Sequence, residues 1–262
     1  MTKTIIIGDL HLQAGLILPS ILKTAKQKKV NNIVLLGDYF DQWHQNDNDD
    51  LYAKEIKTIQ KFTEACSLNN ISIEFLIGNH DLAYILPDIN EPFMSESRDT
   101  RFKVYESLVE LQPKLFTICG KYLLSHAGFT HESEPIIIND INSQTDQRIL
   151  NQIYNDDDSC VWFRHGFYDK IHNSKHPYQI IGHTTVKSIT PLTPSQKVIN
   201  IDTFSLNKNL SPIGDGSYLI LDDTCNHIDI IKFTNWTTTE MDIVRKSYFK
   251  KAKETYYEDF FR

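Results

Sequence analysis

Short apolar runs alternate with segments of helical spacing along the first third of the chain. The runs Thr4–Ile7, Asn32–Leu36 and Ile71–Ile77 are rich in β-branched residues, which predicts three short strands. Between them, Pro19–Val30 and Leu51–Leu68 carry apolar residues at helical spacing, which predicts two helices. Strands that alternate with helices in this way indicate right-handed crossovers and a parallel sheet.

The remainder of the chain is richer in strands. Further strands are expected at Leu115–Cys119, Tyr122–Ser125, Tyr178–Ile181, Lys197–Ile201, Ser217–Leu221 and His227–Phe233. The first two flank Gly120-Lys121 and therefore predict a hairpin. Helices are expected over Glu91–Gln112 and within an insert at about residues 133–167.

The C-terminal segment Thr237–Arg262 has the pattern of an amphipathic helix. Thr237 and Glu240 fit a capping box. The expected apolar face consists of Ile243, Val244, Tyr248, Ala252, Tyr256, Phe260 and Phe261. We therefore expect one domain over residues 1–235 and a helix within residues 236–262 that packs on or near it. A helix that binds a partner is the alternative.

Composition and charge narrow the class of protein. The 262 residues include 27 Lys and Arg against 34 Asp and Glu, a net charge of −7 that argues against a broad basic face for long nucleic acids. The four cysteines are far apart and form no CxxC pair, so neither a disulfide framework nor a zinc ribbon is expected. The N-terminal apolar run is too short for a signal peptide, and no stretch approaches the length of a membrane span. These features predict a cytoplasmic protein without a membrane partner.

Metal-competent side chains follow the ends of five predicted strands. Four of them come directly after a glycine, in Gly8-Asp9, Gly37-Asp38, Gly78-Asn79 and Gly182-His183, and the fifth is His126, which precedes Ala127-Gly128. The carboxyl ends of parallel strands lie along one edge of a sheet, where open α/β sheets bind their ligands. We therefore expect these side chains to converge on one crevice.

The chemistry of these side chains predicts two adjacent metal sites. Asp9 and His11 point to the same side of an extended backbone, and with Asp38 they supply two carboxylates and an imidazole. Asn79, His126 and His183 supply an amide oxygen and two imidazoles, and Asp38 can bridge the two sets. Oxygen and nitrogen ligands without sulfur suit two divalent ions, for which manganese is expected and iron or zinc are alternatives. Such a pair of metals can promote in-line displacement at phosphorus.

Together the motifs resemble those of the calcineurin-like metallophosphoesterases. They are Gly8-Asp9-Leu10-His11, Gly37-Asp38-Tyr39-Phe40-Asp41, Gly78-Asn79-His80-Asp81, His126-Ala127-Gly128 and Gly182-His183-Thr184. They look closest to the branch of serine/threonine phosphoprotein phosphatases and diadenosine-tetraphosphatase-like enzymes. The resemblance implies an α/β (α+β) fold, a four-layer αββα sandwich of two mixed β-sheets flanked by helices. It also assigns the first metal to Asp9, His11 and Asp38, and the second to Asp38, Asn79, His126 and His183.

The resemblance implies catalytic roles for residues beside the ligands. A metal-bridging hydroxide would attack phosphorus, and His80 would protonate the leaving oxygen as general acid. Asp41 would orient His80 through its second ring nitrogen, and Asp81 is a weaker candidate for the same task. Asp202 resembles the family's carboxylate after the last histidine motif and would steady His183 or His126.

The chain departs from the phosphoprotein-phosphatase pattern at two places. Gln42-Trp43 stands where that branch has Arg-Gly, and Phe204-Ser205 replaces the usual glycine after Asp202-Thr203, so a different substrate rim is expected. An arginine normally grips the substrate phosphate with its planar fork. Arg164, Arg98 and Arg101 are the candidates for that contact here, with surface salt bridges as the alternative reading.

The sequence thus predicts a metal-dependent phosphatase or phosphoesterase. The expected substrate is a phosphomonoester on a phosphoprotein or a small molecule. The alternative is a phosphodiesterase or pyrophosphohydrolase that acts on dinucleoside polyphosphates or nucleic-acid ends, and a rival from another class is a non-catalytic metal-binding scaffold. Oligomeric state is not indicated by the sequence.

Overall fold

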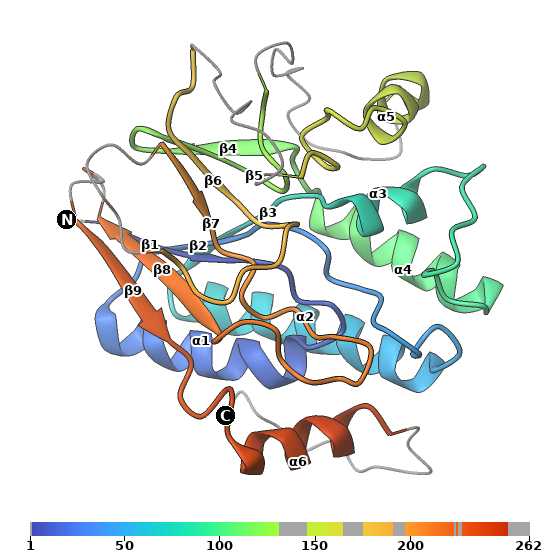
Figure 1. Cartoon of the computed structure of the whole chain (residues 1–262), viewed down its shortest axis with the longest axis horizontal. Helices are drawn as coiled ribbons and strands as arrows, with labels where there is room; N and C mark the ends of the chain where they lie inside the picture. Colours follow the sequence, from blue (N-terminus) through green and yellow to red (C-terminus); the bar gives the residue numbers. More distant parts are fainter. Residues whose placement is uncertain are drawn as a thin grey trace.

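Two mixed β-sheets pack face to face, and helices flank them (Figure 1). The structure is a computed structural model that describes residues 2–130, 146–164, 175–190, 197–222, 224 and 227–250. The five-stranded sheet has the order β3-β2-β1-β8-β9, and the four-stranded sheet has the order β4-β5-β6-β7. The predicted α/β class and the pair of mixed sheets are confirmed.

The bounds of the elements follow the apolar runs closely. The strands of the five-stranded sheet are β1 (Lys3–Ile7), β2 (Asn32–Leu35), β3 (Ser72–Phe75), β8 (Ser217–Asp222) and β9 (Ile228–Lys232). Those of the four-stranded sheet are β4 (Phe116–Cys119), β5 (Tyr122–Ser125), β6 (Gln179–Ile181) and β7 (Val198–Asn200). The helices are α1 (Ala14–Lys28), α2 (Asp49–Leu68), α3 (Asn79–Ile85), α4 (Arg98–Leu111), α5 (Gln147–Tyr154) and α6 (Thr239–Tyr248).

Parallel pairing brings the motif-bearing ends of the strands together. β1 pairs in parallel with β2, and β2 with β3, while α1 and α2 form the crossovers. β4 and β5 form the predicted antiparallel hairpin, and β5 pairs in parallel with β6. The motifs therefore lie on two sheets, three on the first and two on the second, rather than on one continuous sheet.

The interface between the sheets is a separate apolar layer. It contains Ile6, Val34, Leu36, Leu76, Tyr122, Leu124, Ile180, Ile189, Ile199, Ile201, Leu219 and Leu221. Along β1 the side chains alternate, so Ile6 enters this layer whereas Ile5 and Ile7 join the core that includes α1 and α2. Because both faces of β1 are buried, its sequence is continuously apolar rather than alternating.

Two helices begin elsewhere than the sequence predicts, and one helix was not predicted. α1 begins at Ala14 and contains Pro19 in its interior, because the Glu55 carboxylate of α2 accepts the backbone N–H of Ala14 at 2.6 Å and so caps the helix from a distant segment. α4 begins at Arg98 rather than near Glu91, because the Ser97 hydroxyl caps it by accepting the N–H of Thr100. The short helix α3 was not predicted, and it begins at the candidate ligand Asn79.

The expected face of the C-terminal helix is wrong in part. Ile243 and Val244 are exposed in α6, whereas Arg245 is fully buried. The Arg245 guanidinium lies over the ring of the buried Trp236 and donates to its carbonyl oxygen at 2.7 Å, which allows a charged side chain to face inward. The helix is capped by Thr238, which accepts from the N–H of Met241, instead of by the Thr237–Glu240 pair.

α6 lies beside α1 and α2 (Figure 1), where Tyr248 donates a hydrogen bond to Glu55. Its expected continuation over residues 251–262 lies outside the described residues, and so do residues 131–145 and 165–174 in and around the predicted insert. Among the helices that the structure describes, none is long and apolar enough to cross a bilayer.

Candidate metal centre

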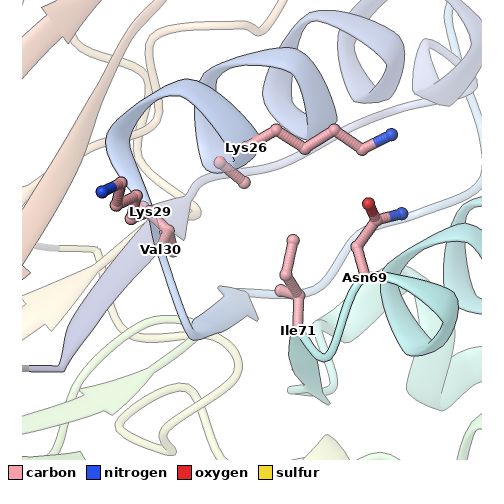
Figure 2. Close-up of a pocket in the computed structure, with 6 residues that line it drawn as sticks. Lys26, Lys29, Val30, Asn69 and Ile71 are labelled. Atoms are coloured by element: carbon pink, nitrogen blue, oxygen red, sulfur yellow. The ribbon is translucent and has the colours of Figure 1, made fainter.

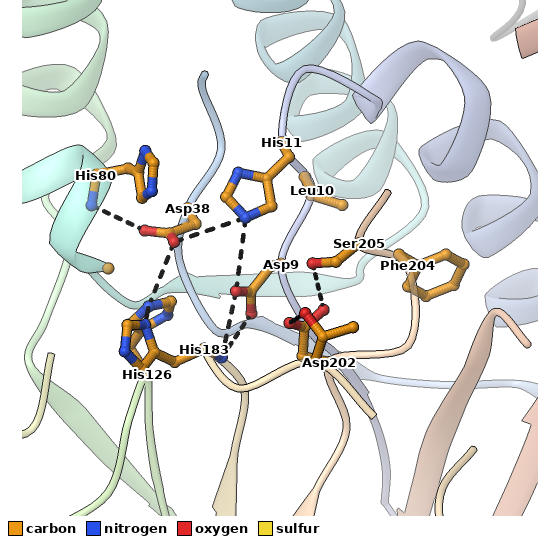
Figure 3. Close-up of polar contacts among 12 residues, drawn as sticks. Asp9, Leu10, His11, Asp38, His80, His126, His183, Asp202, Phe204 and Ser205 are labelled. Atoms are coloured by element: carbon orange, nitrogen blue, oxygen red, sulfur yellow. Dashed lines mark hydrogen bonds and ion pairs between the residues drawn. The ribbon is translucent and has the colours of Figure 1, made fainter. Parts of the chain in front are cut away.

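The predicted ligands meet where the strands of both sheets end (Figure 3). Asp9, Asp38 and Asn79 follow β1, β2 and β3, while His126 and His183 follow β5 and β6. All five are buried. Convergence on one site, expected from the strand ends, is therefore what the fold produces.

Two groups of ligand atoms share Asp38. In the first group, Nε2 of His11 lies 3.8 Å from Oδ2 of Asp9 and 3.8 Å from Oδ2 of Asp38. In the second group, Nε2 of His126 lies 3.4 Å from Oδ2 of Asp38 and 3.2 Å from Nδ1 of His183. Oδ1 of Asn79 lies 3.1 Å from the same Nε2. Asp38 thus stands between the groups, in the position that a bridging carboxylate would need.

Backbone carbonyl groups orient all three imidazoles of the cluster. Nδ1 of His126 lies 2.9 Å from the carbonyl oxygen of Leu36, and Nδ1 of His11 lies 3.0 Å from that of Asp41. Nε2 of His183 lies 3.0 Å from the carbonyl oxygen of Trp162. A carbonyl oxygen only accepts, so each of these ring nitrogens carries the proton. In the neutral imidazoles the other nitrogen then presents its lone pair to the cluster, as a metal ligand must.

The buried carboxylates of the cluster favour a positive charge among them. Burial raises the pKa of Asp9 well above its usual value, and the nearby Asp202 raises it further. Burial would also raise the pKa of Asp38, but His126 and His80 hold it well below its usual range. Burial alone would lower the pKa of His126, but Asp38 and Asp9 raise it to about 10. A proton on His126 can supply the missing positive charge, and a divalent cation would supply it more fully.

These donors fit divalent metal ions. They comprise buried carboxylate oxygens, one amide oxygen and imidazole nitrogens, with lone pairs that face one another over 3.1 to 3.8 Å. The residues can hold two ions through Asp9, His11 and Asp38 on one side and Asp38, Asn79, His126 and His183 on the other.

The backbone at the site adopts left-handed conformations at non-glycine residues. His11, Asp38, Asp41 and His183 have φ values of 44°, 50°, 70° and 62°. Such conformations cost on the order of 1 kcal/mol or more each and are concentrated at functional sites. Glycine is needed at two neighbouring positions for different reasons. Gly37 has φ 107°, and a Cβ added to Gly78 would collide with the carboxylate of Asp38.

His80 and Asp41 are in contact at the rim of the cluster. Nδ1 of His80 lies 3.2 Å from Oδ2 of Asp41, and the His80 side chain is 22% exposed whereas Asp41 is buried. The Asp81 carboxylate has other partners, because it accepts the backbone N–H groups of Asp38, Tyr39 and Gly78 at 2.6, 3.0 and 3.0 Å. Asp81 therefore fixes the loop that carries Asp38, and Asp41 is the carboxylate that the structure brings to His80.

Asp202 lies beside the first ligand group. Its carboxylate accepts from the hydroxyl of Ser205 at 2.7 Å (Figure 3). It also accepts from the hydroxyl of Thr185 at 3.1 Å. Its charge raises the pKa of Asp9. The side-chain hydrogen bonds of Asp202 thus come from hydroxyl groups, whereas the charge of His126, one of the two imidazoles expected from the sequence, contributes to lowering its pKa.

The three candidate arginines occupy different environments. Arg164 is exposed and follows Trp162, and its charge contributes to lowering the pKa of the buried His183, so it lies near the second ligand group. Arg101 instead holds a loop, because it donates to the carbonyl oxygen of Ser95 and to Oδ1 of Asn90. Arg98 is exposed at the first position of α4. Of the three, the structure associates Arg164 alone with the cluster.

Sequence reasoning missed several residues that surround His80 and Asp41. The hydroxyls of Tyr52 and Tyr84 both donate to Oδ1 of Asp41, and the Phe93 ring packs on His80 with centroids 3.9 Å apart. The available signal was weak: a tyrosine on a buried helix face needs a partner for its hydroxyl.

A pocket of about 310 Å³ elsewhere on the protein has no part in this chemistry (Figure 2). It is lined by Ala25, Lys26, Lys29, Val30, Asn69 and Ile71. These residues precede β2 and β3, at the edge of the sheet opposite to the ligands. None of them carries a carboxylate or an imidazole.

Comparison with known proteins agrees with the geometry. The family model described as calcineurin-like phosphoesterase matches residues 2–189. No curated protein matches the chain in sequence.

Solved structures show the same fold at low identity. A cold-active protein-tyrosine phosphatase of a psychrophilic Shewanella species is 16% identical, with a TM-score of 0.60 over 88% of this chain and 81% of that chain. A protein serine/threonine phosphatase from Saccharomyces cerevisiae is 14% identical, with a TM-score of 0.50 over 89% of this chain and 80% of that chain. Because the family model spans well over half of the sequence, the chain belongs to the calcineurin-like phosphoesterase family and is a hydrolase.

Proposed function

We propose that the protein is a phosphomonoesterase that uses two divalent metal ions, with manganese as the working metal. The observation that carries the proposal is the set of buried lone pairs that converge on Asp38 from both sheets. Asp9, His11 and Asp38 would hold one ion, and Asp38, Asn79, His126 and His183 the other. When bound, such ions supply Lewis acidity to the phosphoryl oxygens and lower the pKa of an attacking water.

His80 is the general acid in this proposal. A water oxygen forms a bond to phosphorus, the ester P–O bond breaks, and the leaving oxygen takes the proton from Nε2 of His80. Two observations support the assignment. Oδ2 of Asp41 lies 3.2 Å from Nδ1 of His80, which fixes the orientation of the ring and leaves Nε2 as the nitrogen that can give its proton to the substrate. Burial alone would lower the pKa of His80, but Asp38 and Asp41 raise it, which favours the protonated form that an acid needs.

The preference for a monoester draws on the structural neighbours. The two compared above are a protein-tyrosine phosphatase and a protein serine/threonine phosphatase. Arg164, exposed beside His183, is the proposed contact for the substrate phosphate. The substrate would be a phosphoprotein or a small phosphorylated molecule. A cytoplasmic location belongs to the proposal, and the reduced, buried thiols of Cys66 and Cys160 fit a reducing compartment.

The test is hydrolysis of paired chromogenic esters by protein stripped of metal and reloaded with manganese. A phosphomonoester and a phosphodiester of the same phenol are compared, with Asp38→Asn and His80→Ala beside the wild type. We expect cleavage of the monoester and loss of activity in both variants. Selective cleavage of the diester would replace the monoesterase assignment with a phosphodiesterase. Full activity of a His80→Ala variant that retains both metals would refute the role of His80.

A further inference from the structure

Asp41 is held from two directions by donors on different helices. Its Oδ2 contacts Nδ1 of His80 at 3.2 Å. Its Oδ1 accepts a hydrogen bond from the hydroxyl of Tyr52, on α2, at 2.6 Å and another from the hydroxyl of Tyr84, on α3, also at 2.6 Å. Oδ2 of Asp41 thus contacts the imidazole, whereas Oδ1 accepts the two tyrosine hydroxyls.

The hydroxyls of Tyr52 and Tyr84 are hydrogen-bond donors inside the core. Tyr52 is fully buried and Tyr84 is nearly so, and Asp41 between them is buried as well. Burial, reinforced by the charge of Asp41, raises the pKa of both hydroxyls far above the usual value for tyrosine. Each hydroxyl therefore keeps its proton near neutral pH and donates it to Oδ1.

We propose that Tyr52 and Tyr84 are positioning residues, which lock the Asp41 carboxylate so that Oδ2 alone faces His80. The inference rests on the proposed function, in which His80 is the general acid. The terminal torsion of an aspartate, about its Cβ–Cγ bond, is loosely defined, so the two oxygens could exchange and the imidazole could follow. Two short bonds to one oxygen remove that freedom, and they come from rigid helices rather than from the loop that carries Asp41.

Tyr84 restrains His80 by a second route. Its hydroxyl oxygen accepts the backbone N–H of Ser95 at 2.8 Å, and Phe93 in the same loop packs its ring on His80. Arg101 donates to the carbonyl oxygen of Ser95 from the other side. The acid is thus held by Asp41 at one ring nitrogen and by Phe93 over its ring, and Tyr84 is hydrogen-bonded to Asp41 and to Ser95, in the loop that carries Phe93.

The strength of the effect depends on how much the leaving group needs a proton. Phenolate is a strong base and leaves slowly unless it is protonated, whereas dinitrophenolate is a weak base and leaves without help. Mispositioning of His80 should therefore slow the hydrolysis of phenyl phosphate and spare that of dinitrophenyl phosphate. A general loss of folding or of metal would slow both.

The experiment compares kcat on these two esters for manganese-loaded wild type, Tyr52→Phe, Tyr84→Phe and the double variant. Tyr218→Phe is the matched control, because it also removes a largely buried hydroxyl, one that donates to Thr24 at 3.0 Å between β8 and α1. His80→Ala gives the pattern for complete loss of the acid. Metal content and KM are measured for every protein.

We expect each single variant to lower kcat on phenyl phosphate by about tenfold and on dinitrophenyl phosphate by less than about twofold, since a hydrogen bond to a charged group is lost. The double variant should approach the His80→Ala pattern, and the control should match wild type. Equal losses on the two esters in the tyrosine variants, with a selective loss in His80→Ala, would overturn the inference while leaving the proposed function intact. Equal losses in His80→Ala itself would overturn the general-acid role.

A spectroscopic measurement decides the positioning claim independently of activity. In proton NMR of the zinc-loaded, diamagnetic protein, the Nδ1–H of His80 bonded to Asp41 should give a far-downfield resonance, assigned by its absence in His80→Ala. We expect it to shift or broaden in Tyr52→Phe and Tyr84→Phe and to stay in place in Tyr218→Phe. An unchanged resonance in both tyrosine variants would refute the inference even if the protein hydrolysed neither ester.

Discussion

Glu55 is a buried carboxyl group that joins three helices, and its protonation should make the stability of the protein depend on pH. From α2 it accepts the backbone N–H groups of Ala14 at 2.6 Å and Gly15 at 3.4 Å at the start of α1, and it accepts the hydroxyl of Tyr248 from α6. The positive charge of Lys54 acts on it, and the Lys54 ammonium lies 3.6 Å from the centroid of the Tyr248 ring. Burial raises the pKa of Glu55 to about 7, although these hydrogen bonds lower it.

The sign follows from where each state holds the proton. The usual pKa of 4.5 applies to the unfolded chain, so between pH 4.5 and about 7 the folded protein keeps a proton that the unfolded chain has lost. The stabilising contribution of this proton is complete below the unfolded pKa and is lost as the pH rises through the folded pKa. At 1.36 kcal/mol per pKa unit, the shift corresponds to a loss of about 3 kcal/mol.

The perturbation is Glu55→Gln, which keeps an oxygen for the N–H of Ala14 and cannot titrate. Urea unfolding is measured from about pH 5 to about pH 8 for wild type, Glu55→Gln and Glu64→Gln, the last being an exposed glutamate on the same helix. We expect the free energy of unfolding of wild type to fall by about 2.5 kcal/mol relative to Glu55→Gln over this range, and Glu64→Gln to follow wild type. Groups that titrate at the metal centre affect all three proteins alike and cancel in the difference. Parallel curves for wild type and Glu55→Gln would refute the reasoning.

Four further outcomes are expected. Removal of metal by a chelator should lower Tm reversibly, since ions that bind only the folded state stabilise it by about 2.7 kcal/mol at a hundredfold excess over Kd. Asp38→Asn should reduce the metal content to one ion or fewer per chain by elemental analysis, because Asp38 belongs to both ligand groups. Gly182→Ala should weaken manganese binding at least about tenfold by calorimetry with an unchanged circular dichroism spectrum, because the added Cβ would collide with the Asp9 carboxylate. Arg245→Ala should lower the free energy of unfolding by about 2 kcal/mol in urea, whereas Val244→Ala, at an exposed position one residue earlier, should change it by less than about 0.5 kcal/mol.

The hydrophobic pattern was sufficient to predict an element where the residues of that element alone determine its structure. The β-branched runs predicted β1, β2 and β3 to within two residues at each end, and the side chains after them belong to the two groups that could hold a metal ion. Strand formation and the presence of side chains that can bind metal both depend only on which residues stand within one short segment of the chain. The convergence of the ligands followed from the rule for parallel strands, and that rule held although the strands belong to two sheets.

The sequence misled where a distant group decides the local structure. Pro19 suggested the start of a helix, yet α1 begins five residues earlier because Glu55 caps it from α2. Arg245 belonged to the expected polar side of α6, yet the indole of Trp236 and its carbonyl oxygen accommodate the guanidinium in the core. In both cases the deciding partner lies in another element, and helical spacing carries no information about it.

The candidate metal centre shows the same difference between what local residues determine and what distant groups determine. The residue types show which side chains could bind metal. Which ring nitrogen of each imidazole faces the cluster depends on the backbone carbonyl oxygen that accepts the proton of the other ring nitrogen. Those carbonyls belong to Leu36, Asp41 and Trp162, and a carbonyl is present at every position of every sequence. Side-chain chemistry therefore predicts the composition of such a site, whereas its protonation state is set by backbone geometry that exists only after folding. The left-handed backbone of His11 and Asp41 illustrates the connection, because it brings the Nδ1 of one to the carbonyl oxygen of the other.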